Sequence, residues 1–259
     1  MPATKPQPVR PAIRHVAFGD VGSTNDEALA LAASGEKLPL WVTARRQLAG
    51  RGRQGAPWIS EAGNLYASLA LARSFDLPQA AQLPLVTSLA LHDALAAILG
   101  ADAGLAIKWP NDLMLNRRKI AGILAESKIL ADERPVIVIG CGVNCAHHPK
   151  DTRYPATSLR AEGFMVPPQE LFAEFSQHMT GRLAAWDGGA GFGAIRAAWL
   201  DRATGLGETI HVRLPRSTIE GVFVGLDAAG RLVLSQASGE RVISAGELFF
   251  DAAQAENAL

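Results

Sequence analysis

The chain has 259 residues, enough for one large domain or for a large domain with a small companion. Its 25 Lys and Arg balance 25 Asp and Glu, so it lacks the basic excess of proteins that coat a nucleic-acid duplex. Hydrophobic residues make up 48% and charged residues 19%, two cysteines are too few for a disulfide framework, and neither a signal peptide nor a membrane-spanning apolar run stands out. We therefore expect a folded cytoplasmic protein that binds neither a membrane nor DNA.

The elements expected before residue 204 mix strands with helices. Residues 1–11 are polar and proline-rich, which predicts a flexible tail without room for a helix-turn-helix DNA-binding domain. A strand over 13–18 precedes a helix that begins at a capping box of Thr24 and Glu27 and ends at Gly35. Apolar and β-branched runs predict six further strands, and the last is a central strand covered on both faces. These strands are 40–44, 64–72, 105–109, 113–115, 119–127 and 136–143.

Two long helical regions complete this part, over 82–99 and from 167 to about 200. From residue 207 the pattern changes to short, evenly spaced strands with glycine turns, which is typical of a small β-barrel. Its expected strands are 210–214, 221–226, 231–235 and 241–244, and we place the boundary near 204–208. The expected fold class is therefore α+β, followed by a small all-β domain.

A glycine–arginine loop over 50–55 matches the sequence of the G-x-G-x-x-G dinucleotide fingerprint but lacks its structural context. That motif needs a helix at its third glycine to hold a pyrophosphate, and here Ala56, Pro57 and Trp58 follow without a helical period. We therefore reject a dinucleotide site. The remaining alternatives are a mobile basic surface loop and a flexible backbone whose two guanidinium groups wrap around a phosphate or carboxylate.

The run Lys-Trp-Pro-Asn-Asp at 108–112 also has two interpretations. It is either a strand with a packed Trp and a turn, or a lysine, an amide and a carboxylate that hold a nucleotide phosphate and its Mg²⁺. Lys119 would reach the same region if the strands on either side of residues 116–118 pair as a hairpin, and otherwise it is an ordinary edge lysine.

Other polar groups are less informative. Ser23 and Thr24 are either helix caps or ligand-binding hydroxyls at a helix N-terminus. Cys141, Cys145 and the His147–His148 pair follow no structural zinc spacing, so we do not expect them to bind metal. The chain contains neither the G-x-S-x-G motif nor the H-E-x-x-H motif of hydrolases.

Six short motifs occur in an order that resembles the biotin–protein ligase family, whose members attach biotin to carboxylase carrier domains. The motifs are Ser23-Thr24-Asn25, Gln47-x-x-Gly50-Arg51-Gly52-Arg53-x-Gly55-x-x-Trp58, Gly63-Asn64-Leu65-Tyr66, Lys108-Trp109-Pro110-Asn111-Asp112, Lys119-Ile120-Ala121-Gly122-Ile123-Leu124 and Gly140-x-Gly142-x-Asn144. The resemblance implies a mixed β-sheet catalytic domain of the class II synthetase-like type over 12–204 and an SH3-like barrel over 207–252. Without an N-terminal DNA-binding domain, the chain resembles the monofunctional type.

The resemblance also implies two half-reactions. Biotin and ATP give biotinyl-5′-AMP and pyrophosphate, and a lysine of a biotin carboxyl carrier domain then takes the biotin and releases AMP. The nucleophile comes from that partner, so no Ser or Cys nucleophile is needed. ATP and biotin are thus the expected small molecules, with Mg²⁺ accompanying ATP.

By position in the family motifs, Lys119 is the expected main electrostatic catalyst and Arg53 retains the adenylate. The expected biotin-binding residues are Ser23, Thr24, Asn25, Gln47, Gly50, Arg51, Gly52, Arg53, Lys119 and Gly122. The expected nucleotide-binding residues are Arg53, Trp58, Lys108, Asn111, Asp112 and Asn144, with Asp112 as the candidate ligand of Mg²⁺. Gln54 and Ala56 stand where the family loop often has two arginines. This difference bears on how tightly the loop holds the adenylate.

Two alternatives stay open. A lipoate-type protein ligase would share the fold and the adenylation chemistry, whereas a non-catalytic biotin-sensing regulator would need a DNA-binding segment. An exposed sheet edge would also allow a homodimer.

Overall fold

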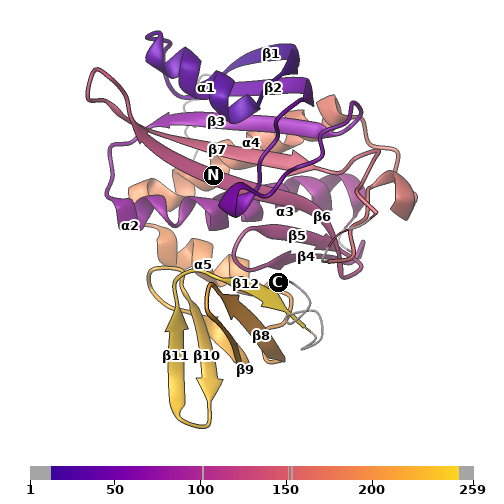
Figure 1. The fold of residues 1–259 in the computed structure, drawn as a ribbon, viewed down its shortest axis with the longest axis vertical. Helices are drawn as coiled ribbons and strands as arrows, with labels where there is room; N and C mark the ends of the chain where they lie inside the picture. Colours follow the sequence, from indigo (N-terminus) through magenta and orange to yellow (C-terminus); the bar gives the residue numbers. More distant parts are fainter. Residues whose placement is uncertain (1–12, 101, 151, 153, 251–259) are drawn as a thin grey trace, which may run out of the picture.

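The structure is a computed structural model that describes residues 13–100, 102–150, 152 and 154–250. It contains a seven-stranded mixed sheet flanked by helices and, after it, a five-stranded antiparallel sheet (Figure 1). The expected α+β class is therefore confirmed. The expected tail over 1–11 lies outside the described residues, as do residues 12, 251 and 252 at the ends of the two expected domains.

The large sheet has the strand order β1-β2-β3-β7-β6-β5-β4. Its strands are β1 (Arg14–Val21), β2 (Leu40–Gln47), β3 (Leu65–Ala72), β4 (Leu105–Lys108), β5 (Asp112–Leu115), β6 (Arg118–Ile129) and β7 (Pro135–Val143). β1 and β2 are parallel, and every other pair is antiparallel. β7 lies between β3 and β6, which confirms the central strand expected from its continuous apolar run.

Helices cover both faces of this sheet. α1 (Thr24–Ala33) packs on β2, β3 and β7, whereas α3 (Leu83–Leu99) and α4 (Pro168–Trp186) lie behind the sheet in Figure 1. Side chains on β7 alternate accordingly, because Val136 and Val138 join the small core under α1 while Ile137 and Ile139 join the large core under α3. The face under α1 is where the candidate site lies.

The segment Leu77–Leu99, formed by α2 (Leu77–Ala80) and α3, is long and apolar enough by length and composition to cross a membrane. Neither such a segment nor α2 was expected from the sequence. Most of the segment is buried, and the buried apolar side chains of α3 belong to the large core. Packing against the sheet, α4 and α5 (Phe192–Leu200) thus accounts for its apolar character.

The start of α1 differs from the expectation. Ser23 is the N-cap residue, no side chain caps the helix, and the Thr24 hydroxyl donates to Gln47 Oε1 at 2.9 Å. The predicted capping box is therefore wrong, because the hydroxyl has a partner on β2 instead of on its own helix. The expected helical region after residue 167 is two helices, α4 and α5, separated at Asp187 and the glycines that follow it, which adopt positive φ.

The C-terminal sheet has the order β11-β10-β9-β8-β12. Its strands are β8 (Thr209–Leu214), β9 (Ser217–Leu226), β10 (Leu232–Gln236), β11 (Gly239–Ile243) and β12 (Glu247–Phe249). The last of these, β12, was not expected from the sequence. β11 and β12 stand at the two ends of the sheet in the described residues, so closure into an SH3-like barrel stays a prediction.

A partly buried ion-pair cluster joins α3, α4 and the end of α5. Asp93, whose side chain is 13% exposed, accepts a hydrogen bond from Arg182 Nε at 2.7 Å and lies 3.4 Å from Arg202. We expect Asp93→Asn to lower the free energy of unfolding by about 1–3 kcal/mol, because two partly buried guanidinium groups lose their charged acceptor. Chemical denaturation measures this, with the exposed Asp132→Asn as a control that should leave the transition unchanged. Equal transitions for both variants would contradict a structural role for the cluster.

Candidate active site

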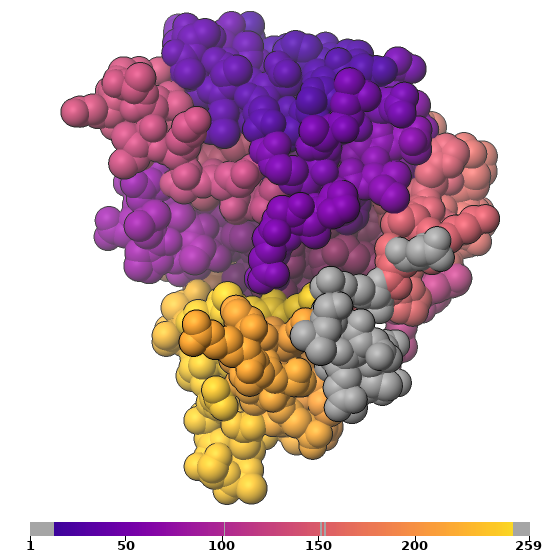
Figure 2. Space-filling view, viewed as in Figure 1, coloured from indigo at the N-terminus to yellow at the C-terminus, as the bar shows by residue number. Residues whose placement is uncertain are grey.

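A cavity of about 660 Å³ opens on the α1 side of the large sheet. Its walls are the N-terminus of α1, the loop over 51–59, the turn between β4 and β5, and residues 246–248 of the C-terminal domain. In the space-filling view, purple atoms from the region of this loop extend across the front of the molecule to the yellow C-terminal domain (Figure 2). The two domains thus meet at the cavity.

Glycines on the central strands form the floor of the cavity. A Cβ atom at Gly140 would lie 2.4 Å from Asn25 Oδ1, and one at Gly142 would lie 2.4 Å from the indole nitrogen of Trp58. A Cβ at Gly122 would lie 3.2 Å from the same indole. Both α1 and Trp58 therefore approach the sheet only because these positions carry no side chain.

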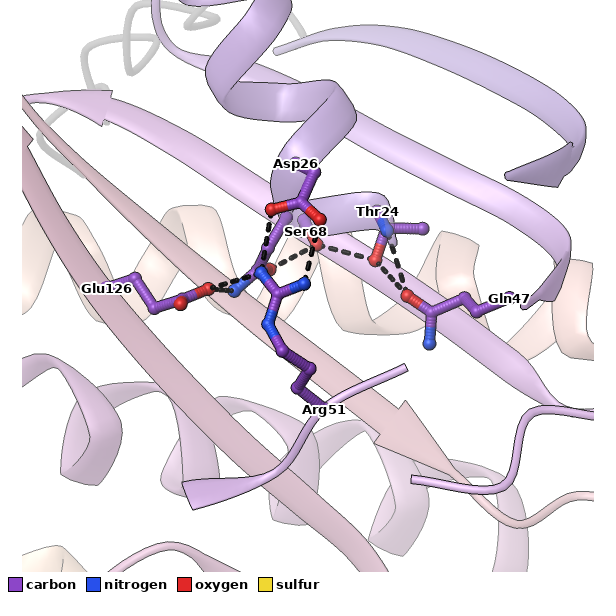
Figure 3. A network of polar contacts seen from close by, with 7 residues as sticks. Thr24, Asp26, Gln47, Arg51, Ser68 and Glu126 are labelled. Atoms are coloured by element: carbon purple, nitrogen blue, oxygen red, sulfur yellow. Dashed lines mark hydrogen bonds and ion pairs between the residues drawn. The ribbon is translucent and has the colours of Figure 1, made fainter. Parts of the chain in front are cut away.

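At one end of the cavity, polar side chains form a continuous network (Figure 3). Gln47 Oε1 accepts from the backbone N–H of Thr24 at 2.8 Å and from its hydroxyl at 2.9 Å. Ser68 Oγ lies 2.7 Å from Thr24 Oγ1 and 2.6 Å from Asn25 Oδ1. Asn25 Nδ2 donates to Glu126 Oε2 at 2.6 Å. This end is therefore rich in oxygen atoms that can accept hydrogen bonds.

The first arginine of the loop is anchored beside this network (Figure 3). Arg51 donates two hydrogen bonds to Asp26 at 2.7 and 2.8 Å, and it lies 3.8 Å from Glu126 Oε2. The guanidinium group lowers the pKa of Asp26 by hydrogen bonding. The loop is thus attached to the first turn of α1, in the bidentate geometry that arginine and carboxylate favour.

At the other end of the cavity, one carboxylate lies between two lysines. Lys119 Nζ is 2.6 Å from Asp112 Oδ1, and Lys108 Nζ is 3.8 Å from Asp112 Oδ2. A β-bulge brings Lys119 to this face, because Asp112 pairs with Gly122 and Met114 with Lys119, so that β6 has one residue more than β5. The expected hairpin is therefore confirmed, and Lys119 reaches the 108–112 turn.

Lys108 is buried, with 1% of its surface exposed, and its ammonium group lies 3.3 Å from the ring centroid of Tyr154. Burial lowers its pKa from 10.5 to about 8, while Asp112 opposes this shift. Among the described residues its Nζ has no hydrogen-bond partner. A buried cation with unused donors suits an anionic ligand.

Contacts with the C-terminal domain hold this end together. Arg53 donates to the carbonyl of Gly246 at 3.1 Å, and Tyr154 donates to the carbonyl of Leu248 at 2.5 Å. Asn111 donates to the carbonyl of Ile123 at 2.5 Å, which fixes the turn against β6.

The structure brings the expected site residues together. All of them line the cavity except Gly50, which packs under the loop, where a Cβ would lie 2.6 Å from Ser60 Oγ. Asn144 lines the cavity while it donates to the carbonyl of Thr157 at 3.0 Å. As expected, no α-helix follows the glycine–arginine loop, which contains only a short 3₁₀ turn over Arg53–Gly55.

Five residues that shape the site were not expected from the sequence: Asp26, Ser68, Glu126, Tyr154 and Gly246. Of these, Ser68 could have been found from the sequence, because it is a polar residue within an apolar strand, where it is fully buried. The four Cys and His residues near 141–148 belong to no metal-binding group among the described residues, and burial raises the pKa of the Cys141 and Cys145 thiols.

Known proteins share both parts of the chain. Residues 21–144 match the model of the Biotin/lipoate A/B protein ligase family, and residues 205–251 match the Biotin protein ligase C terminal domain. A biotin--[acetyl-CoA-carboxylase] ligase from Paracoccus denitrificans is 42% identical over 237 residues, which are 88% of this chain and 97% of that protein.

Two solved structures are similar over nearly the whole chain. The biotin protein ligase from Aquifex aeolicus in complex with biotin and ATP has a TM-score of 0.76 and 26% identity, and it covers 91% of this chain and 97% of its own. The biotin protein ligase from Leishmania major in complex with biotinyl-5-AMP has a TM-score of 0.68 and 28% identity, and it covers 92% and 100%. Taken with the motifs and the cavity, these similarities establish that the chain belongs to the biotin protein ligase family.

Proposed function

We propose that this protein joins biotin to ATP, giving biotinyl-5′-AMP and pyrophosphate, and then transfers the biotin to a lysine of a carboxylase carrier domain. The observation that carries the proposal is a single cavity with a hydrogen-bonding network at one end and a lysine–aspartate cluster at the other. The similar ligases that bind biotin, ATP or biotinyl-5-AMP support it.

The first half-reaction brings two anions together, the carboxylate of biotin and the α-phosphate of ATP. In the proposed arrangement the ureido ring lies against Ser23, Thr24, Asn25 and Gln47, and the biotin carboxylate points toward Lys119. Lys119 then stabilises the negative charge that develops on the phosphate, and Lys108 adds a second positive charge behind Asp112. Gly122 supports this by leaving the floor open beside the Lys119 side chain.

The adenylate must be kept from water until the acceptor arrives. We assign this task to the loop that carries Gly50, Arg51, Gly52 and Arg53, because it is anchored to α1 at one point and to Gly246 at another. Trp58 already lies on the glycine floor, where its ring can pack on the adenine, and we expect Asn111 and Asn144, which line the cavity, to lie beside the nucleotide. Gln54 and Ala56 leave this loop with two guanidinium groups.

Mg²⁺ would enter with ATP. Asp112, which pairs with Lys119 in this structure, is the carboxylate we propose to hold the ion, in keeping with an ion that is commonly held by one or two carboxylates and by substrate phosphates. When bound, Mg²⁺ neutralises phosphate charge.

The second half-reaction needs only the amine of the acceptor lysine, which attacks the mixed anhydride and releases AMP. The acceptor we propose is the biotin carboxyl carrier domain of acetyl-CoA carboxylase, as the name of the Paracoccus relative suggests. We place the reaction in the cytoplasm, without DNA or a membrane as partner. In the described residues β1 and β4 end the large sheet, but Ile107 of β4 is bridged to Ala203, so the edge of β1 is the one that would allow a homodimer.

Exchange of labelled pyrophosphate into ATP tests the proposal, with biotin, lipoate and octanoate compared in parallel. Exchange that depends on biotin alone is the expected result, because adenylate formation is reversible and the polar network suits the ureido ring. Exchange with lipoate alone would move the chain to the lipoate-type alternative. Folded protein that exchanges with none of the three acids would contradict a ligase.

Lys119→Ala should lower the rate of adenylate formation by on the order of 100-fold or more, because it removes a charge at the reacting centre. Its side chain is 25% exposed, so the fold should persist, as thermal unfolding would show. Lys128→Ala, an exposed lysine on the same strand, is the matched control and should keep the wild-type rate. A normal rate for Lys119→Ala would remove its catalytic assignment.

The low pKa of Lys108 predicts opposite effects of pH on activity and stability. As pH rises through about 8, the folded protein loses the charge of Lys108, so kcat/KM for adenylation should fall. Between about 8 and 10.5 the unfolded chain binds more protons at this residue than the folded protein, so its contribution to stability rises with pH.

Lys108→Met should lower kcat/KM at every pH. It should also remove the decrease in kcat/KM and the rise in stability that the titration of Lys108 causes above about pH 8. Rates and denaturation midpoints measured between pH 7 and 9.5 would check this, with Lys128→Met as the control. An alkaline decrease that persists unchanged in Lys108→Met would assign it to another group.

A further inference from the structure

Three short contacts in the polar network each join two oxygen atoms, but only two hydrogen atoms are available for them. They join Ser68 Oγ to Asn25 Oδ1 at 2.6 Å, Ser68 Oγ to Thr24 Oγ1 at 2.7 Å, and Thr24 Oγ1 to Gln47 Oε1 at 2.9 Å. Each contact needs one hydrogen between its two oxygens, and only the two hydroxyl groups can supply one. One of the three contacts therefore brings two acceptors together without a proton.

The shortage depends on which way the side-chain amides of Gln47 and Asn25 are turned, and neighbouring groups fix both orientations. The backbone N–H of Thr24 donates to Gln47 Oε1 at 2.8 Å, so the amide oxygen of Gln47 must face Thr24. Asn25 Nδ2 lies 2.6 Å from Glu126 Oε2, and a carboxylate can only accept. Asn25 must therefore turn its NH₂ group to Glu126 and its oxygen to Ser68.

Glu126 is the origin of the shortage. If Asn25 turned its amide over, Nδ2 would donate to Ser68, Ser68 to Thr24, and Thr24 to Gln47, and every contact would have its hydrogen. The carboxylate of Glu126 opposes this, because the oxygen of Asn25 would then face it at 2.6 Å. Ser68 is fully buried and Thr24 and Asn25 are each 4% exposed, so an unmatched acceptor is unfavourable there.

We infer that Glu126 makes this end of the cavity selective for a ligand that brings N–H donors. The inference rests on the proposed function and identifies a specificity-determining residue for it. A cyclic urea offers two N–H groups, either of which can donate to the acceptor left without a hydrogen, whereas the dithiolane ring of lipoate offers none. Glu126 acts on the ligand through Asn25, so it is a positioning residue.

A second interpretation must be separated from this one, because Glu126 also lies 3.8 Å from Arg51. If Glu126 mattered only by holding the loop, loss of the stronger Arg51 partner, Asp26, would have at least the same effect. Asp26→Asn is therefore the matched control. It weakens the anchor of Arg51 and leaves the Asn25–Glu126 contact in place.

Glu126→Gln is the decisive variant, because it keeps the shape and can still accept from Asn25. Unlike Glu, it can also donate, which lets Asn25 turn over and completes the network without a ligand. We expect biotin and desthiobiotin, which both carry the cyclic urea, to bind about tenfold more weakly, the size of one buried hydrogen bond. KM for biotin should rise by the same factor, while kcat and KM for ATP stay close to wild type.

Isothermal titration calorimetry on the full chain measures the affinities, and pyrophosphate exchange gives the kinetic constants. The side chain of Glu126 is 34% exposed, so the Gln variant should keep the wild-type melting temperature. Unchanged biotin affinity in Glu126→Gln would overturn the inference, since a simple anchor for Asn25 survives that change. An equal loss in Asp26→Asn would also overturn it, by placing the effect in the loop.

A different result would contradict the proposed function. Wild-type protein that is folded but binds no biotin would contradict the ligase itself before any variant is compared. Wild-type protein that binds both ureas but not lipoate, with a larger loss of urea binding in Glu126→Gln than in Asp26→Asn, would support both.

Discussion

The site depends on the missing side chains of Gly140 and Gly142 on the central strand β7. Any Cβ there would come within 2.4 Å of Asn25 or of Trp58, so neither α1 nor the loop could take its position. The same strand contributes alternate apolar side chains to both cores, which keeps this floor rigid. A rigid strand without side chains lets flexible parts of the chain close directly on a sheet.

Electrostatics at the other end depend on a local irregularity of β6. In a regular strand Lys119 would share the face of Ala121, which packs in the large core, whereas the bulge turns it to the face of Gly122 and Asp112. Asp112 then balances two lysines, one of them fully buried. Without this carboxylate two positive charges would lie close together in a site of low polarity, at a large cost in stability.

Local patterns in the sequence were enough to predict the strands of the large sheet, α3 and the motifs that line the cavity. They failed where a partner lies far along the chain. Thr24 looked like a cap because its partner Gln47 is 23 residues away, and Glu126 stayed unnoticed because Asn25 is 101 residues away. The β-bulge of β6 depends on the register of its pairing with β5, so the amino-acid sequence of neither strand predicts it. β12 and α2 are too short for a periodic pattern.

The two ends of the cavity have opposite requirements. One contains a contact between two oxygen atoms that has no hydrogen, and the other presents Lys108, whose ammonium group has no hydrogen-bond partner in the described part of the chain. A ligand that fits both must therefore donate N–H groups at one end and carry negative charge at the other. Biotin with ATP meets this description, since the urea and the carboxylate lie at opposite ends of biotin and the phosphates extend the negative charge. Each unmet group costs stability in the empty protein, and in the proposed complex each would gain a partner from the substrates.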